Sequence, residues 1–415
     1  MGRWAAIAVL TLTSVAHADP DTLGKLLGRI DAVAKEVSKV RGLPLKHAIP
    51  NDVVDKDELH ARLLKMAGDG KTAAETKAEG IALERWGMVP PGTDYTKLVL
   101  DLLTDQIAGY YDPDTKKLTV SQAAGADPQW AEMVLAHELD HGLQDQSFDL
   151  KKFEDLPDSE GDASTARHAL TEGDGIALML EVMLIRNHAP IPWANPEIAD
   201  AIAKAMSAPG GGGDAMDKAP LALREAMIFP YREGFAFVAA LRRNKPWSAV
   251  DDAFTKRPPR STEQIIHPER YLADDQPVPV ALAVPAGWTK LEETVWGELG
   301  FDLWLRSHGV GADVAAEAST GWGGDRTMVI ERGNVRVGLA HTVWDSEPDA
   351  IEAFEAAAKA IAESVVGGRI EAGPTRFAAM ALDGTVSSVE RRGAEMVIVH
   401  GAPAYALKSL EVQIR

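Results

Sequence analysis

Two histidines four residues apart, with a glutamate beside the first, form the segment of this chain best suited to chemistry. The segment reads His137-Glu138-Leu139-Asp140-His141. On an α-helix, positions i and i+4 lie on one face, one turn apart, so both imidazoles could bind one zinc ion. Glu138 would stand beside the ion, where a carboxylate can take a proton from metal-bound water. A helix with two surface histidines is the alternative explanation.

The third metal ligand is expected on a later helix. A catalytic zinc ion usually takes three protein ligands and a water molecule, and the chain has 0 Cys, so His, Asp or Glu must complete the set. We expect Glu172, because Gly173 and Gly175 are unfavourable inside a helix and indicate that another element approaches closely. The alternatives are His168, one turn earlier, and Asp162 or another carboxylate. Asp174 is expected to orient a ligand histidine.

Hydrolysis by zinc-bound water also requires a donor to the oxyanion that forms when water attacks a carbonyl. Tyr231 and His267 are the candidates. A buried structural role is the favoured alternative for each of them. With Glu138 as general base, they would complete the set of catalytic residues.

Periodicity predicts the elements that position these residues. Apolar residues at helical spacing predict helices over residues 21–70, 128–148, 162–187 and 217–243. An Asp-Pro-Asp turn inside residues 109–120 predicts a β-hairpin. After Pro277 the pattern changes to strands, which are predicted at residues 278–284, 327–330, 335–343, 377–382, 385–390 and 395–399, with an Ala-rich helix at 349–363. We therefore expect an α+β protein with a boundary near residue 277.

The assembled motifs resemble the gluzincin class of zinc metallopeptidases. More closely, residues 137–146, 172–174 and 261–271 resemble a group of predicted bacterial secreted metallopeptidases. The resemblance covers roughly residues 95–272. It implies a mainly helical, zincin-like catalytic domain at 91–277, one Zn²⁺ per chain and a protein or peptide substrate. The gap from His141 to Glu172 is longer than in thermolysin, and Glu172 does not stand in that enzyme's ligand motif, so Glu172 is assigned by position.

The ends of the chain complete the expected organisation. Arg3, an apolar run over residues 4–15 and Ala16-His17-Ala18 predict a signal peptide at 1–18, and therefore a secreted or periplasmic protein. A buried N-terminal helix is the alternative. Residues 19–90 are expected to be a helical region, with a propeptide as an open alternative. Residues 278–415 are expected to form a smaller α+β domain of unknown role, which could bind an unknown partner.

The net charge of -19 argues against binding to nucleic acid, and no later segment has the apolar length of a membrane span. The expected function is hydrolysis of peptide bonds by Glu138-assisted attack of zinc-bound water. One alternative is a non-catalytic, metal-stabilised envelope protein. Another is a zinc amidase that acts on non-peptide or cell-wall amides. Glu138 favours an enzyme, because a purely structural metal site needs no general base.

Overall fold

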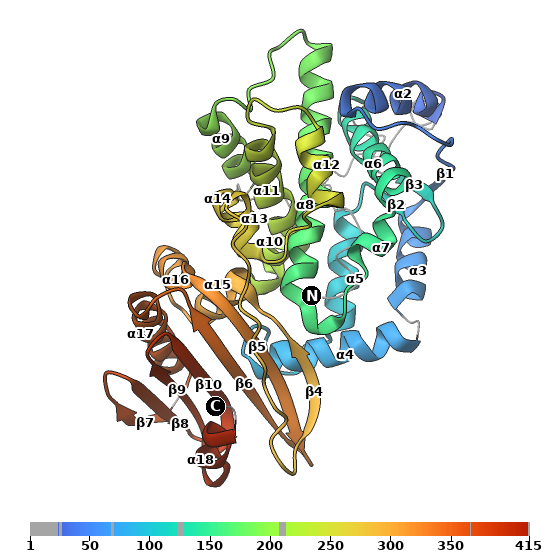
Figure 1. Cartoon of the computed structure of the whole chain (residues 1–415). Helices are drawn as coiled ribbons and strands as arrows, with labels where there is room; N and C mark the ends of the chain where they lie inside the picture. Colours follow the sequence, from blue (N-terminus) through green and yellow to red (C-terminus); the bar gives the residue numbers. More distant parts are fainter. Residues whose placement is uncertain are drawn as a thin grey trace.

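The computed structural model describes residue 24 and residues 27–67, 70–122, 128–206, 213–365 and 367–413. Helices dominate the chain up to residue 272, and strands dominate the remainder, so the expected mixed α and β composition is confirmed (Figure 1). The expected signal peptide lies outside the described residues. None of the helices in the described ranges combines the length and the apolar character that a membrane crossing requires.

The elements of the mainly helical part are α2 (Ile30–Arg41), β1 (Asn51–Val54), α3 (Lys56–Ala67), α4 (Gly70–Arg85), α5 (Tyr95–Gln106), β2 (Gly109–Asp112), β3 (Lys117–Ser121), α6 (Pro128–Phe148), α7 (Leu150–Glu154), the 3₁₀ helix η3 (Asp158–Glu160), α8 (Gly161–Arg186), α9 (Pro196–Met206), α10 (Gly213–Lys218), α11 (Leu221–Arg242), α12 (Ser248–Thr255), α13 (Thr262–Ile266) and α14 (Pro268–Leu272).

Helix α8 is the central element of this part, with α6 and α2 on one side and α11 on the other (Figure 1). Its middle is buried all round, from Ala166 to Met179 with the exception of the partly exposed Arg167. The backbones of α8 and α11 touch where Gly173 faces Gly234, because a Cβ on either glycine would collide with the opposite backbone. The two glycines therefore set how closely these helices pack.

A small three-stranded sheet stands beside α6 in the order β1-β3-β2. Strands β2 and β3 pair antiparallel, which confirms the predicted hairpin. Strand β1 pairs parallel with β3, with Asn51 opposite Leu118. The expectation of a wholly helical N-terminal region is therefore wrong, because this region contributes the strand β1. The β-branched pair Val53-Val54 follows Pro50, and this combination favours an extended backbone once a partner strand is available.

The C-terminal part contains β4 (Thr289–Thr294), α15 (Gly297–Ser307), α16 (Ala312–Ser319), β5 (Trp322–Arg332), β6 (Val335–Trp344), α17 (Glu347–Ser364), β7 (Gly367–Ala372), β8 (Arg376–Ala381), β9 (Thr385–Arg392), β10 (Glu395–Pro403) and α18 (Ala404–Gln413).

These strands form one antiparallel sheet of seven, in the order β4-β5-β6-β10-β9-β8-β7. Alternate residues point to opposite faces: Val329 joins the main core, whereas Met328 and Ile330 pack with Leu410 of α18. Helix α17 covers the first face. The predicted strands from residue 327 onward and the Ala-rich helix are confirmed.

The strand predicted at residues 278–284 is wrong. This segment is fully described and forms no regular strand, although Val278 N donates a hydrogen bond to Gly323 O (2.7 Å). Pro277, Pro279 and Pro285 lack the N–H that a sheet ladder requires, so the segment runs along β5 without pairing regularly.

The N-terminal region also joins the two parts of the molecule. Trp86, which follows α4, is buried against Trp296 (4.5 Å between ring centroids) and Trp304 (6.3 Å). Its ring fills the space above Gly338 of β6, where a Cβ would lie 2.9 Å from ring carbons. Residues from the first quarter of the chain are therefore part of the core of both parts.

Candidate metal centre

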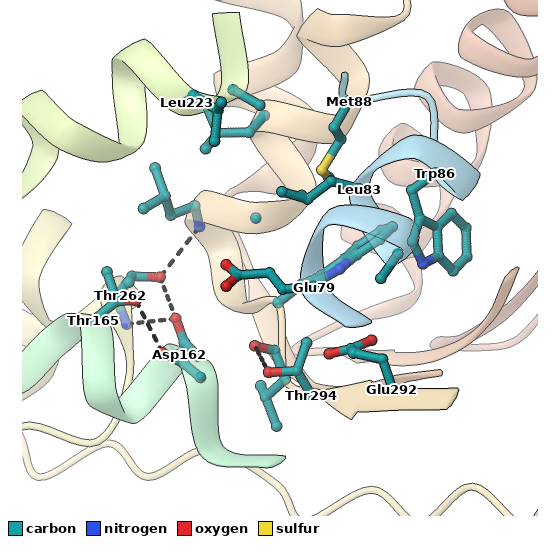
Figure 2. Close-up of a pocket in the computed structure, with 18 residues that line it drawn as sticks. Glu79, Leu83, Trp86, Met88, Asp162, Thr165, Leu223, Thr262, Glu292 and Thr294 are labelled. Atoms are coloured by element: carbon teal, nitrogen blue, oxygen red, sulfur yellow. Dashed lines mark hydrogen bonds between the residues drawn. The ribbon is translucent and has the colours of Figure 1, made fainter. Parts of the chain in front are cut away.

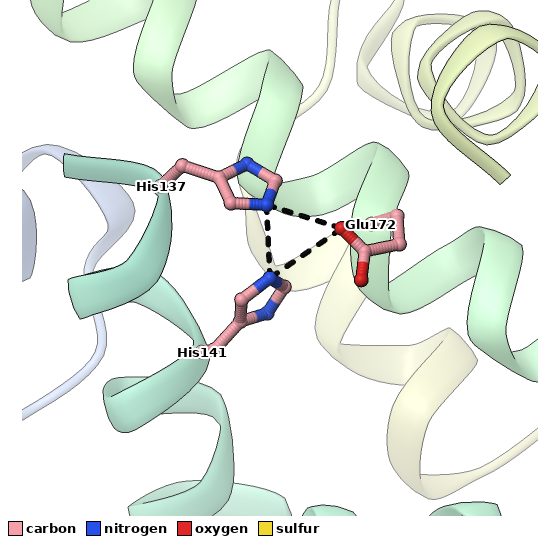
Figure 3. Close-up of side chains that lie close together, drawn as sticks. All are labelled: His137, His141 and Glu172. Atoms are coloured by element: carbon pink, nitrogen blue, oxygen red, sulfur yellow. Dashed lines mark hydrogen bonds and ion pairs between the residues drawn. The ribbon is translucent and has the colours of Figure 1, made fainter. Parts of the chain in front are cut away.

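Three side chains converge between α6 and α8: His137 and His141 from the first helix and Glu172 from the second (Figure 3). The two Nε2 atoms lie 3.0 Å apart, and Oε2 of Glu172 lies 3.1 Å from Nε2 of His137 and 3.5 Å from that of His141. For tetrahedral zinc with bonds of about 2.0–2.1 Å, ligand atoms stand about 3.3–3.4 Å apart. The three atoms thus have the spacing of one face of such a coordination shell.

Burial and charge make this cluster suited to a cation. All three residues are at most 4% exposed. Two imidazole nitrogens this close cannot both present lone pairs to each other without a proton or a cation between them. Burial alone would raise the pKa of Glu172, but His141 and His137 hold this pKa far below its usual range. Burial opposes a charge on His141, yet Glu172 raises the pKa of its imidazole to about 10. In the metal-free cluster a proton on His141 therefore balances Glu172, and metal binding would release it.

Glu138 stands beside the cluster and is not one of its members. Its Oε2 accepts a hydrogen bond from Tyr111 N (2.9 Å) on the outer edge of β2, while its Oε1 has no hydrogen-bond partner within the described ranges. Burial raises the pKa of Glu138 to about 8; the neighbouring Glu172 adds to this rise, and His141 opposes it. The carboxylate of Glu138 is held in place, keeps one oxygen without a hydrogen bond, and interacts electrostatically with both His141 and Glu172. Such a group is suited to accept and donate a proton.

The two glycines that follow Glu172 confirm the close approach predicted from them. Gly173 faces Gly234 of α11, as described above. Gly175 faces the ring of His137, because an added Cβ would lie 2.7 Å from both Nδ1 and Cε1 of that histidine. A side chain at either position would displace a ligand or its helix.

The alternative ligands take other positions. His168 lies beside Glu172, with Nε2 3.7 Å from Oε1 and with Nδ1 3.6 Å from Glu154 on its other side. The contacts of His137 and His141 are with the other oxygen, Oε2. Asp162 lies at the start of α8, where its Oδ1 accepts hydrogen bonds from N (3.1 Å) and Oγ1 (2.6 Å) of Thr262. Among the described residues, the group with metal-ligand spacing contains neither of them.

The two candidate oxyanion donors are separated by the fold. Tyr231 comes from α11 and is 9% exposed, and its ring centroid lies 6.4 Å from that of His137. His267 lies between α13 and α14, where its Nε2 is 2.9 Å from Oε1 of Glu298 on α15. Tyr231 is therefore beside the cluster, whereas His267 joins the helical part to the C-terminal part.

Other residues of the motif at 261–271 also connect the helical part to the C-terminal part. Ser261 caps α13 by accepting a hydrogen bond from Gln264 N (3.2 Å). Thr262 holds Asp162 and also accepts a hydrogen bond from Leu299 N (3.2 Å). These contacts bind the start of α8 to α15.

We expect His267→Gln to destabilise the protein more at about pH 6 than at about pH 9. The hydrogen bond with Glu298 raises the pKa of His267 above its usual value of about 6.5. A group with a raised folded-state pKa contributes stability below its unfolded pKa, and this contribution disappears as the pH rises through the folded value. Because His267 is partly exposed, the effect should be about 1 kcal/mol or less. Thermal unfolding of both proteins across this range measures it, and a difference independent of pH would contradict the expectation.

Sequence reasoning missed the side chain that holds His141. Gln144, one turn further along α6, accepts a hydrogen bond at Oε1 from Nδ1 of His141 (2.9 Å). Its Nε2 lies 3.1 Å from Oδ2 of Asp174, so Gln144 connects Asp174 to the imidazole of His141. The spacing of three residues between His141 and Gln144 is a helical signal that could have identified this contact.

A separate cavity of about 90 Å³ lies where α4, α8, α11, β4 and α15 meet (Figure 2). Glu79, Asp162 and Glu292 line it together with Trp86 and Trp296. None of the three cluster residues is among its described lining residues. The metal cluster and this cavity are therefore different places in the molecule.

Comparison with known proteins adds one match. Residues 286–411 match a family described as a domain of unknown function, DUF8575. The match covers the C-terminal sheet and its helices and contains no residue of the metal cluster. No curated protein and no solved structure matches the chain.

Proposed function

We propose that this protein is a zinc-dependent metallopeptidase with a zincin-like catalytic region and a cluster of His137, His141 and Glu172 as its metal site. The observation that carries the proposal is the combination of three buried ligand atoms at tetrahedral spacing with a fourth residue, the acidic Glu138, held next to them and outside the ligand set. In the part of the chain that the structure describes, the group consists of three side chains and not four. Three ligands leave a position for water, which distinguishes catalytic from structural zinc sites.

The residues around the cluster have separate tasks in this proposal. When bound, zinc would lower the pKa of a coordinated water to about 7 and polarise the scissile carbonyl. Glu138 accepts the water proton at Oε1, while Tyr111 N keeps Oε2 in place, and it then delivers the proton to the leaving amine. Tyr231 is the candidate donor to the oxyanion, because it is the one of the two candidates that lies beside His137.

Metal content tests the site first. Elemental analysis of the purified protein should give about one zinc per chain, and His141→Ala should lose it, because two remaining ligands do not hold zinc tightly. Cleavage of a mixed peptide library by the wild type, abolished by a chelator and restored by zinc, would then support the peptidase. A folded wild type without stoichiometric metal would overturn the proposal.

Tyr231→Phe should lower kcat by about 10²-fold, the usual effect of losing one oxyanion donor, with little change in zinc content. Tyr271→Phe is the matched control, since the Tyr271 hydroxyl donates to Arg257 O (2.8 Å) and Tyr271 is not one of the residues assigned to the mechanism. Steady-state kinetics of both variants decides the question. A wild-type kcat in Tyr231→Phe would remove this residue from the mechanism.

A further inference from the structure

Arg41, the last residue of α2, is buried among the residues that surround the metal cluster. Its side chain is 0% exposed. The guanidinium donates a bidentate pair of hydrogen bonds to Asp174 of α8, from Nε to Oδ1 (2.8 Å) and from Nη2 to Oδ2 (2.9 Å). Its Nη1 donates to Asp251 (2.7 Å). It also lies over the ring of Trp247, 4.5 Å from the centroid. This bidentate geometry holds the carboxylate in one orientation.

The orientation of Asp174 determines that of Gln144. The Nε2 group of Gln144 is surrounded by three acceptors, namely Oδ2 of Asp174 (3.1 Å), Thr171 O (3.2 Å) and Oδ2 of Asp140 (3.1 Å). An amide placed among acceptors must direct its NH₂ group toward them, so its oxygen points the other way. That oxygen faces Nδ1 of His141 at 2.9 Å.

The amide oxygen in turn selects the form of His141 that can bind a metal. An oxygen only accepts, so Nδ1 must carry the hydrogen and Nε2 is left to present its lone pair to the cluster. We propose that Arg41 is a positioning residue of the metal site, which fixes the ring of His141 through Asp174 and Gln144. The proposal builds on the proposed function in one respect, namely that His141 binds a metal.

The contacts of Arg41 with Asp174 make α2 an integral part of the proposed site. Removal of α2 would leave Asp174 buried without its cationic partner, which is strongly unfavourable. Removal would also take away β1, which pairs with β3. In this proposal the described segment from α2 to β1 is a component of the metal centre, in contrast to a propeptide that is discarded on activation.

Zinc affinity of Arg41→Lys tests the proposal, with Arg242→Lys as the matched control. Arg242 lies over the same Trp247 ring at 4.5 Å and pairs with a buried carboxylate, Glu181 (2.8 Å). Among the described residues its hydrogen bonds go to Glu181 and to Lys245 O, and not to Asp174 or Gln144. Lysine keeps the positive charge but cannot make the bidentate hydrogen bonds to Asp174. Competition with a chelator should show about 10–100-fold weaker zinc binding in Arg41→Lys and unchanged binding in Arg242→Lys.

A double-mutant cycle separates positioning from general destabilisation. Gln144→Ala should weaken zinc binding by a similar factor, and adding Arg41→Lys to it should weaken binding little further, because both residues act through one chain of contacts. Equal zinc affinities of wild type and Arg41→Lys, an equal loss in the Arg242→Lys control, or fully additive effects would each overturn the proposal. If Arg41→Lys does not fold, Asp174→Asn takes its place in the cycle, and unchanged zinc affinity in that variant would overturn the proposal equally.

These measurements read metal affinity and not turnover. A wild type that binds zinc but cleaves no peptide would contradict the proposed function and leave the role of Arg41 open to the same test. A wild type that cleaves peptides, with an Arg41→Lys variant that binds zinc equally well, would contradict the role of Arg41 alone.

Discussion

Glu138→Gln is expected to lower peptide hydrolysis by about 10³-fold and to leave the zinc in place. The amide oxygen of Gln can still accept the hydrogen bond from Tyr111 N, so the side chain should keep its position. It has no basic oxygen to receive the proton of water, and general bases typically contribute 10²–10⁴-fold. The ligand atoms belong to three other residues, so metal affinity should not fall.

The experiment compares zinc content, kcat and thermal stability of Glu138→Gln with those of Glu154→Gln. Glu154 lies near the site, 3.6 Å from Nδ1 of His168, but takes no part in the proposed chemistry. Burial raises the pKa of Glu138, which means that its charge is unfavourable in the folded protein. The stability of metal-free Glu138→Gln should therefore equal or exceed that of the wild type. Turnover near the wild-type rate in a zinc-loaded Glu138→Gln would refute the assigned mechanism.

Glu172→Ala is expected to weaken zinc binding by more than about 100-fold, a larger loss than the 10–100-fold typical of residues that only contact a ligand. Glu172 supplies the anionic member of the cluster, and its removal leaves two neutral imidazoles in a buried site. Its neighbour His168 contacts Oε1, at 3.7 Å, and not the Oε2 atom that lies beside the two histidines, so His168→Ala should weaken zinc binding by about 10-fold or less.

Chelator competition on the two variants gives the order of the effects. Circular dichroism of each metal-free variant controls for loss of structure, since both residues are buried. If His168→Ala loses more zinc affinity than Glu172→Ala, the third ligand has been assigned to the wrong residue.

Much of the candidate metal site could be predicted from short-range patterns. The spacing of His137 and His141 requires a shared helical face, and α6 provides it over Pro128–Phe148. Glu172 was inferred from the two glycines that follow it, and the structure shows why they are needed: one faces α11 and the other the ring of His137. Such predictions succeed because the backbone geometry of a helix places neighbouring positions without reference to the rest of the chain.

The strand predicted at residues 278–284 is the local pattern that failed. Val278-Pro279-Val280 has the alternation of a strand, but its prolines cannot pair in a sheet. For His267 the local motif does not indicate its neighbour: its Nε2 lies 2.9 Å from Oε1 of Glu298, a residue outside the motif.

By itself, the sequence therefore determined the two helices, the three side chains that they bring together (His137, His141 and Glu172) and the α and β composition of the two parts, because these follow from the spacing of neighbouring residues. Only the tertiary structure decided that Arg41 supports Asp174, that β1 joins the hairpin and that Tyr231, and not His267, lies beside the cluster. Each of these contacts joins positions far apart in the chain. These contacts depend on how the helices and strands pack together. The spacing of residues in one segment does not indicate which side chain from a distant segment will pack against it.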